Sequence, residues 1–288
     1  MINEEPGYEK ANHEPSTQRR IVVLISGSGT NLQALVDAQN TPALPDTRIS
    51  LVLSNRKAAY GLTRASQADP PIPTAYLALQ PFLKANPGRT RDDYDVEVAR
   101  IIIREKPDLV VLAGWMHIMG DGFLDVINGD RVLEGEEKVE KPIPVINLHP
   151  ALPGAFDGAN AIERAYEAFQ KGEISHSGVM VHRVVKEVDR GEPLLVREIE
   201  IKKDDSVESF ADRLHKTEWE IIVQGAAKVL DEVAPFPVSR QFVTVARDTN
   251  CSLLTAVMKN EKMYHYNMYD HISAPIGLIE SHLYQLYL

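Results

Sequence analysis

Short runs of consecutive apolar residues recur along the chain, and amphipathic stretches separate them. Apolar runs rich in β-branched residues are typical of strands that are buried on both faces of a parallel sheet. They predict strands at 21–26, 49–54, 75–79, 108–113 and 144–148. Apolar residues at helical spacing predict helices at 32–39, 58–68, 92–105, 159–170 and 206–230. Because strands and helices alternate, we expect a mostly parallel sheet with right-handed crossovers.

Two later runs change the expected edge of this sheet. The segments 178–185 and 194–201 have the character of strands, and Asp189-Arg190-Gly191 supplies turn residues between them. This short connection favours an antiparallel pair. The predicted fold class is therefore α/β, with a Rossmann-like, mostly parallel sheet, helices on both faces and an antiparallel edge.

Both ends of the chain and one internal stretch lack this periodicity. Residues 1–19 mix Glu, Pro, Asn and Lys without an apolar run, which predicts a disordered leader. The charged stretch 131–142 predicts an exposed loop. Prolines interrupt the chain after the last helix. We therefore expect one domain at 20–232 and a C-terminal extension of unknown role at 233–288.

The composition narrows the class of protein. The 288 residues include 31 Lys and Arg against 41 Asp and Glu, which gives a net charge of −10. A chain this acidic is a poor nucleic-acid binder, so an anionic substrate must be bound by a local feature. No apolar run is long enough to span a membrane, and the N-terminus has no secretory signal. Cys251 is the single cysteine, which fits a reducing, cytoplasmic location.

The segment Ser26–Asn31, with the sequence SGSGTN, lies between a predicted buried strand and a predicted helix. Glycines let backbone N–H groups approach a ligand closely, and a helix N-terminus adds unpaired N–H groups and a partial positive charge. Both features favour a phosphate site. The dinucleotide fingerprint is incomplete, because Leu32 occupies the position of its third glycine, and no P-loop Lys follows. A plain strand-to-helix turn is the alternative.

Asn147 and His149 stand at the carboxyl end of a predicted strand, where ligands bind in open α/β sheets. Because they are two residues apart on an extended backbone, their side chains point to the same side. The amide suits stabilisation of an oxyanion, and the imidazole suits proton transfer or, as a cation, charge stabilisation. Asp189, in the turn between the last two strands, would hold a nearby histidine charged and oriented. The alternatives are a structural histidine and an exposed turn carboxylate.

The metal-ligating residue types are scattered. No Cys or His cluster has the spacing of a zinc site. Tyr264, His265, Tyr269 and His271, in the C-terminal extension, are better explained by packing or disorder than as ligands. We expect neither a metal nor a tightly bound cofactor.

Several segments, taken in order over about 20–230, resemble the folate-dependent phosphoribosylglycinamide formyltransferases. The similarity rests on IVVLISGSGTNLQALVDA, LSNRKAAYGLTRA, PDLVVLAGWMHIM, INLHPALPG, HSGVMVHRV and EVDRGEPLL. The sequence of 149–166, HPALPGAFDGANAIERAY, and the insertion near 131–142 resemble fungal members of this family. The resemblance implies a Rossmann-like formyltransferase fold and formyl transfer from 10-formyltetrahydrofolate to the amine of 5'-phosphoribosylglycinamide in purine synthesis. It also implies small-molecule substrates, no metal, no nucleic acid, no membrane, and a monomer or homodimer.

The resemblance also implies roles for individual residues. The catalytic trio would be Asn147, His149 and Asp189. The substrate side would consist of Gly29, Thr30, Asn31 and Glu218. The folate would contact Arg91, Met116, His117, Ile118, Met119, Asn147, Val185, Lys186, Glu187, Val188 and Asp189. Relatives commonly carry Arg at the position of His117 and Ser-Leu-Leu-Pro where this chain has Ala-Leu-Pro-Gly after Pro150; both departures concern folate contacts.

Acyl transfer is the chemistry expected of this trio. The substrate amine attacks the formyl carbon, Asn147 and protonated His149 stabilise the oxyanion, and Asp189 holds His149. Either His149 or a water relays the proton. Two other formyl-folate enzymes are alternatives: methionyl-tRNA formyltransferase, which needs a basic RNA-binding domain, and formyltetrahydrofolate hydrolase, which needs an N-terminal regulatory domain. A non-catalytic nucleotide-binding module is the alternative outside the enzymes.

Overall fold

The computed structural model describes residues 18–235, 242–245, 254–259, 262–267 and 274–275. The chain divides into two units, 1–233 and 234–288, and each is described by itself. The predicted disordered leader falls outside the described residues except for its last two positions.

Seven strands of the first unit form one sheet in the order β3-β2-β1-β4-β5-β6-β7. In chain order they are β1 (Arg19–Ile25), β2 (Thr47–Ser54), β3 (Thr74–Tyr76), β4 (Leu109–Leu112), β5 (Val145–His149), β6 (His176–Arg183) and β7 (Pro193–Glu200). Neighbours from β3 through β5 pair in parallel, whereas β5 with β6 and β6 with β7 pair antiparallel. The predicted mostly parallel sheet with an antiparallel edge is confirmed.

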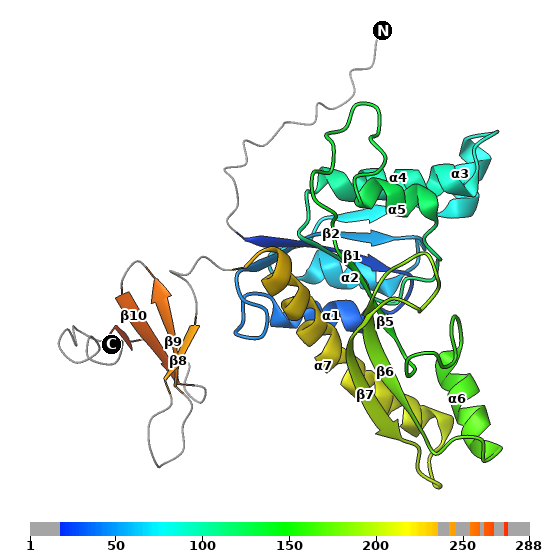
Figure 1. The fold of residues 1–288 in the computed structure, drawn as a ribbon, viewed down its shortest axis with the longest axis vertical. Coiled ribbons are helices and arrows are strands. Elements are labelled where there is room, and N and C mark those ends of the chain that lie inside the picture. The colour runs from blue at the N-terminus through cyan, green and yellow to red at the C-terminus, as the bar shows by residue number, and fades with distance from the viewer. Residues whose placement is uncertain (1–17, 236–241, 246–253, 260–261, 268–273, 276–288) are drawn as a thin grey trace. The chain divides into compact units, whose positions relative to one another are not determined.

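Helices cover both faces of this sheet (Figure 1). They are α1 (Thr30–Ala38), α2 (Tyr60–Gln67), α3 (Leu79–Ala85), α4 (Arg91–Arg104), α5 (Asp121–Ile127), α6 (Ala161–Gln170) and α7 (Val207–Val233). One hydrophobic cluster joins the sheet to α1, α2, α6 and α7, and a second joins it to α4 and α5. Successive residues of β1 enter opposite clusters, Val23 the first and Leu24 the second. Burial on both faces is therefore the reason that the run is apolar throughout.

Three elements differ from the sequence prediction. The strand expected at 75–79 is the three-residue β3, and the helix α3 begins at Leu79. No residue of α3 is fully buried, although Leu79 and Phe82 pack against the second cluster, and its seven residues are too few to repeat an apolar spacing. The pattern did not indicate α5 either, because a helix of seven residues is too short to repeat an apolar spacing.

The stretch 131–142 lies between α5 and β5, and none of its residues belongs to a helix or strand. Most of it is exposed, as predicted for a loop. Glu136 nevertheless accepts hydrogen bonds from Arg100 and Arg104 of α4, at 3.0 and 2.6 Å. The loop is therefore attached to α4 by charged contacts.

The described part of the second unit is a small antiparallel sheet. Its strands are β8 (Phe242–Val245), β9 (Leu254–Lys259), β10 (Lys262–Asn267) and β11 (Ala274–Pro275), in the order β11-β10-β9-β8. Tyr264 and His265 belong to β10, whereas Tyr269 and His271 lie outside the described residues.

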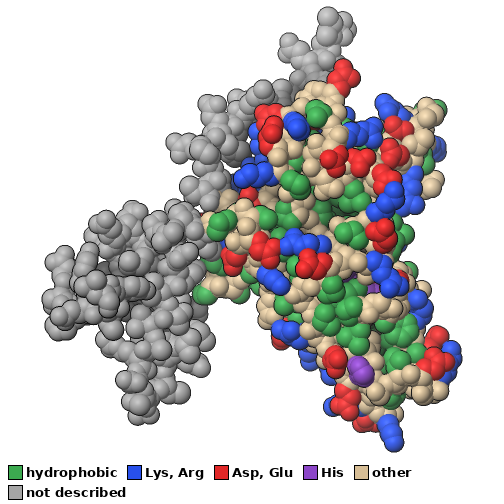
Figure 2. All heavy atoms as spheres, in the orientation of Figure 1, with side chains coloured by type: hydrophobic (Ala, Val, Ile, Leu, Met, Phe, Trp, Pro, Cys, Tyr) green, Lys and Arg blue, Asp and Glu red, His purple; other side chains and the backbone are tan. Residues whose placement is uncertain are grey.

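Charged side chains of both signs are interspersed over the face of the first unit that Figure 2 shows. On that face Lys and Arg do not gather into one patch, so an anionic ligand there would meet no broad positive field. Across the part of the chain that the structure describes, no helix has the length and apolar character to cross a membrane.

Candidate active site

A pocket of about 840 Å³ lies at the edge of the sheet where β1, β4 and β5 end. The loops that follow neighbouring parallel strands meet at this edge. The pocket is lined from 27–31, 112–119, 147–150, 158–162 and parts of 182–189, together with Arg91, His215 and Glu218. Every site residue expected from the sequence therefore lines it, with the exception of Lys186.

His149 is the last residue of β5 and is 3% exposed. Its Nδ1 lies 3.5 Å from Asp189 Oδ2, and its Nε2 lies 3.4 Å from the carbonyl oxygen of Ala155. Both ring nitrogens face acceptors, which suits an imidazolium because that form donates from both. The contact with Ala155 is long, so a ligand oxygen in the pocket can replace it.

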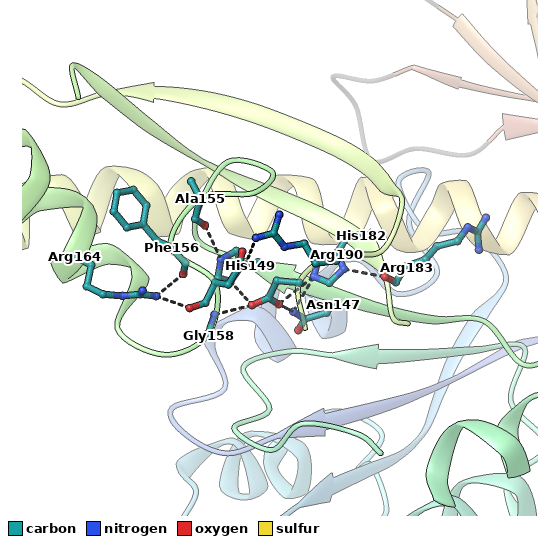
Figure 3. Close-up of polar contacts among 11 residues, drawn as sticks. Asn147, His149, Ala155, Phe156, Gly158, Arg164, His182, Arg183 and Arg190 are labelled. Carbon is teal, nitrogen blue, oxygen red and sulfur yellow. Dashed lines mark hydrogen bonds and ion pairs between the residues drawn. The ribbon is translucent and has the colours of Figure 1, made fainter. Parts of the chain in front are cut away.

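Asn147 lies two residues earlier on the same side of β5, and Figure 3 shows its side chain converging with those of His149 and His182. Its Nδ2 is 3.2 Å from Asp189 Oδ1 and 3.1 Å from His182 Nε2. These two partner atoms are only 3.4 Å apart, so both lie on one side of the amide nitrogen. The amide of Asn147 thus faces the pair formed by Asp189 and His182, and both contacts are long enough for a ligand oxygen to take over an N–H of this amide.

His182 is a member of this cluster that the sequence analysis missed. It lies on β6, directly opposite Asn147 in the antiparallel register, and is 2% exposed. Its Nδ1 donates to the carbonyl oxygen of Arg183 at 2.9 Å. Since a carbonyl can only accept, Nδ1 carries a proton and Nε2 faces Asn147 and Asp189. The sequence shows a histidine within a predicted strand, but only the register of β6 against β5 places it beside Asn147.

Asp189 is held in the left-handed region at φ 55°, which Asp tolerates better than most residues. Its Oδ2 accepts the N–H of Gly158 at 2.8 Å. Burial acts to raise the pKa of Asp189, but hydrogen bonds from His182 and Gly158 and the nearby His149 outweigh it, so this pKa lies below its ordinary value. The carboxyl is therefore ionised between the two histidines at neutral pH.

The loop that carries Asp189 closes tightly on β6. A Cβ atom at Gly191 would lie 1.6 Å from the carbonyl oxygen of Arg183, so a side chain there requires the backbone to move. Arg190 Nη2 donates to Asp157 Oδ2 at 2.6 Å, which ties this loop to the 155–158 stretch beside His149 (Figure 3). The two loops thus support the cluster of Asn147, His149 and Asp189.

The SGSGTN turn forms another part of the pocket wall. Gly29 is the N-cap of α1 at φ 72°, and no side chain caps the helix. Among the described residues, the N–H groups of 28–31 have no acceptor. Unpaired N–H groups at a helix N-terminus favour binding of an anion. Because the turn lines the pocket, its position supports the hypothesis of a phosphate site over the alternative of a plain strand-to-helix turn.

Glu218 of α7 lies beside this turn and is 4% exposed. Its Oε2 lies 3.2 Å from Asn31 Nδ2 and 3.1 Å from His215 Nδ1. The hydrogen bond to Glu218 raises the pKa of His215 against the opposing effect of burial. The sequence analysis missed His215, although its spacing of three residues from Glu218 on one helix is a usable signal.

Asp95 of α4 holds the backbone segment 116–120 in place and is 1% exposed. Its Oδ1 lies 2.6 Å from His117 Nε2, and its Oδ2 accepts the N–H of Gly120 at 3.0 Å. A Cβ atom at Gly120 would lie 2.8 Å from Asp95 Oδ2. The side chain of His117 thus serves to anchor the segment through a buried carboxylate.

The same segment is held at two more points. Met116 N–H donates to Ser26 Oγ, and Arg91 Nη2 donates to the carbonyl oxygen of Ile118, both at 2.7 Å. Met116 and Ile118 line the pocket and yet are 57% and 53% exposed. A rigid backbone with exposed apolar side chains suits a flat, partly apolar ligand.

Lys186 is directed elsewhere than its neighbours in the loop. Its Nζ donates to Asp121 Oδ2 of α5 at 2.7 Å, whereas Val185, Glu187 and Val188 line the pocket. Over the described ranges, no group of three or more His, Cys, Asp and Glu side chains is placed to hold a metal ion.

Comparisons with known proteins show what this unit is similar to. Residues 19–225 match the family model described as "Formyl transferase". The chain is 45% identical to the phosphoribosylglycinamide formyltransferase of Schizosaccharomyces pombe over 74% of this chain and 97% of that protein. It is 42% identical to the Saccharomyces cerevisiae protein of the same name over 74% and 98%. The crystal structure of glycinamide ribonucleotide transformylase 1 from Geobacillus kaustophilus superposes with a TM-score of 0.60 at 29% identity, covering 74% of this chain and 99% of that one.

Proposed function

This chain belongs to the formyl transferase family, and we propose that its pocket carries out the phosphoribosylglycinamide formyltransferase reaction. The enzyme transfers a formyl group from 10-formyltetrahydrofolate to the amine of 5'-phosphoribosylglycinamide. The products are formylglycinamide ribonucleotide and tetrahydrofolate, in the de novo synthesis of purines. Similarity over nearly the whole length of two relatives with this name favours it over tRNA formylation and formyl-folate hydrolysis.

One observation carries the proposal for the site: a single pocket holds all the parts that this reaction needs. The 27–31 turn offers unpaired N–H groups, Asn147, His149 and Asp189 form a charged cluster, and 116–119 forms an apolar rim. A module that only bound nucleotides would have no need of a buried carboxylate between two histidines.

The ribonucleotide occupies the side of the pocket formed by α1 and α7. Its phosphate lies against the N–H groups of Gly29, Thr30 and Asn31, next to the positive end of α1. Glu218 Oε2 is already engaged by Asn31 and His215, so Oε1 accepts hydrogen bonds from N–H or O–H groups of the substrate.

The folate lies along the 116–119 segment and the 185–189 loop. Met116 and Ile118 cover its ring system, and the fixed backbone between them offers polar groups to the ring edge. Arg91 donates to the carbonyl oxygen of Ile118 through Nη2 only. Its remaining N–H groups suit a carboxylate of the folate.

The chemical step takes place between these two ligands. The substrate nitrogen bonds to the formyl carbon, the carbonyl oxygen becomes an oxyanion, and the bond from carbon to folate N10 then breaks. An N–H of Asn147 and the imidazolium of His149 stabilise the oxyanion, while ionised Asp189 holds the imidazolium. One proton leaves the amine and one reaches N10, through His149 or a water.

The direct test is to mix the protein with glycinamide ribonucleotide and 10-formyl-dideazafolate and to follow the absorbance. Turnover that requires both compounds, with formylglycinamide ribonucleotide as product, is expected. If micromolar enzyme gives no product while the ribonucleotide still binds, the chain is a binding module and the proposed chemistry is wrong.

We also propose that 20–232 is the complete catalytic domain and that 233–288 has no part in the site. A cytoplasmic location, a monomeric or homodimeric state and the absence of nucleic-acid partners stay predictions from the sequence.

A further inference from the structure

The SGSGTN turn is tied to α2 through its backbone carbonyl groups. The carbonyl oxygen of Gly27 accepts the N–H of Gly61 at 3.1 Å, and that of Ser28 accepts Arg64 Nε at 2.9 Å. Gly61 and Arg64 belong to α2 and do not line the pocket, whereas 27–31 does. Both carbonyl groups therefore point toward α2 and away from the pocket.

The direction of these carbonyl groups decides where the next N–H groups point. In a planar trans peptide, the C=O of one residue and the N–H of the next point in opposite directions. The contact at Gly27 therefore turns the N–H of Ser28 toward the pocket, and the contact at Ser28 does the same for the N–H of Gly29. Neither N–H has an acceptor within the described residues.

Arg64 is itself held in place on this side of the turn. Its Nη1 donates to Gln33 Oε1 of α1 at 3.2 Å, and its guanidinium carbon lies 5.1 Å from the ring centroid of Tyr60. A Cβ atom at Gly29 would lie 2.6 Å from the Cα atom of Gly61, so the turn and α2 are already in close contact. A permanently charged guanidinium is thus fixed directly behind the turn.

We propose that Arg64 is a positioning residue for the phosphate group of the substrate. It holds the Ser28 carbonyl so that the N–H of Gly29 faces the phosphate, and its charge stabilises the bound anion from behind the turn. This inference rests on the proposed function and adds a residue to it that does not line the pocket. Gly61 acts through its backbone, so Arg64 is the anchor that a side-chain substitution can remove.

The experiment compares each enzyme variant on a substrate that carries the phosphate and on one that lacks it. Arg64→Met removes the donors and the charge but keeps an apolar stem, and Arg64→Lys keeps the charge and one donor group without the planar guanidinium that reaches both Ser28 and Gln33. Lys57→Met is the matched control, because Lys57 is an exposed cation in the loop before α2. For each variant, kcat and KM are measured with glycinamide ribonucleotide and with the dephosphorylated riboside, and inorganic phosphate is titrated as an inhibitor.

Arg64→Met is expected to raise KM for the ribonucleotide about tenfold, with kcat nearly unchanged, because a charge-assisted contact is lost. The inhibition constant of inorganic phosphate rises in parallel, while kcat/KM for the riboside stays at the wild-type value. Arg64→Lys falls between wild type and Arg64→Met, and Lys57→Met behaves as wild type.

Two results would overturn the inference while leaving the proposed function intact. One is an equal loss of kcat/KM for both substrates, which means that Arg64 only supports the fold. The other is a wild-type KM for the ribonucleotide in Arg64→Met.

If the wild-type enzyme itself does not prefer the ribonucleotide to the riboside, the phosphate placement fails and the inference fails with it. If Arg64→Met does not fold, Arg64→Lys decides by the same comparison.

Discussion

At the scale of the residue, the chemistry depends on what each nitrogen of His149 faces. Asp189 Oδ2 lies 3.5 Å from Nδ1 and the Ala155 carbonyl oxygen 3.4 Å from Nε2. In the mechanism that we propose, a doubly protonated ring donates to both acceptors and lies beside the amide of Asn147. An oxyanion that forms in this corner meets donors that are already oriented, so little reorganisation is needed.

His149→Ala is expected to lower kcat by about 10²–10³-fold, since one stabilising group of the oxyanion is lost. The affinity for glycinamide ribonucleotide should stay within about twofold, because the 27–31 turn and Glu218 are unchanged. Steady-state kinetics and calorimetry measure the two effects. His176→Ala, an exposed histidine on β6, is the control that should keep full activity. Wild-type turnover in His149→Ala would rule out the mechanism.

Asp189→Asn keeps the backbone conformation, since Asn also tolerates the left-handed region, but it removes the charge that holds His149. We expect kcat to fall about 10²-fold. The acidic limb of the pH–rate profile should also move, because in the wild-type enzyme the low pKa of Asp189 keeps this carboxylate ionised into acid. A profile of unchanged shape in the variant would show that Asp189 does not tune His149.

The same carboxyl predicts how stability depends on pH. The pKa of Asp189 is lower in the folded chain than its ordinary value, so the folded state binds this proton less readily than the unfolded state does. The carboxylate therefore contributes stability above the unfolded pKa, and this contribution is lost as the pH falls through the folded pKa. The difference in unfolding free energy between wild type and Asp189→Asn should be constant near neutral pH and shrink below about pH 4. Urea titrations test this, and a difference that grows in acid would contradict it.

At the scale of the element, the pocket depends on how segments are fixed to one another. The 116–120 segment belongs to no helix or strand, but Asp95 of α4 binds it at His117 and at Gly120. A loop without such anchors would have to be ordered by the ligand, at a cost in conformational entropy. The carboxylate of Asp95 thus orders the side of the pocket on which we propose that the folate binds, before any ligand arrives.

Asp95→Asn should therefore raise KM for the formyl folate about tenfold while leaving KM for the ribonucleotide unchanged. The physical reason is that an amide cannot accept from both His117 and the N–H of Gly120 as the carboxylate does. Kinetics with each substrate varied in turn provide the measurement. Glu97→Gln, on the same helix, is the control. An equal rise in both KM values would mean that the variant merely disturbs the fold.

At the scale of the whole molecule, the described residues that line the pocket belong to one unit. The residues described as lining the pocket extend from Gly27 to Glu218, all inside the unit 1–233. The family match, over 19–225, covers the same stretch. The extent of the family match is the ground for our proposal that 233–288 takes no part in the site.

A chain that ends after Pro235 is accordingly expected to keep kcat and both KM values within about twofold of the full chain. The full-length protein, purified and assayed in parallel, is the control. A large loss of activity in the shortened chain, at an unchanged thermal midpoint, would show that residues after Pro235 contribute to the site.

The sequence alone determined the features that are local in the chain. Apolar periodicity specified the alternating strands and helices, SGSGTN specified a turn with free N–H groups, and the two-residue spacing of Asn147 and His149 placed them on one side of β5. The sequence did not predict α3 and α5, because each has only seven residues and cannot repeat an apolar spacing.

Only the tertiary structure decided which distant residues meet. The register of β5 against β6 sets His182 opposite Asn147, and loop closure brings Asp189 to a residue 42 positions away. Asp95 behind His117 and Arg64 behind Ser28 are contacts of the same kind. Strand pairing and loop closure join segments whose own sequences are compatible with many partners, so no local pattern encodes the contact.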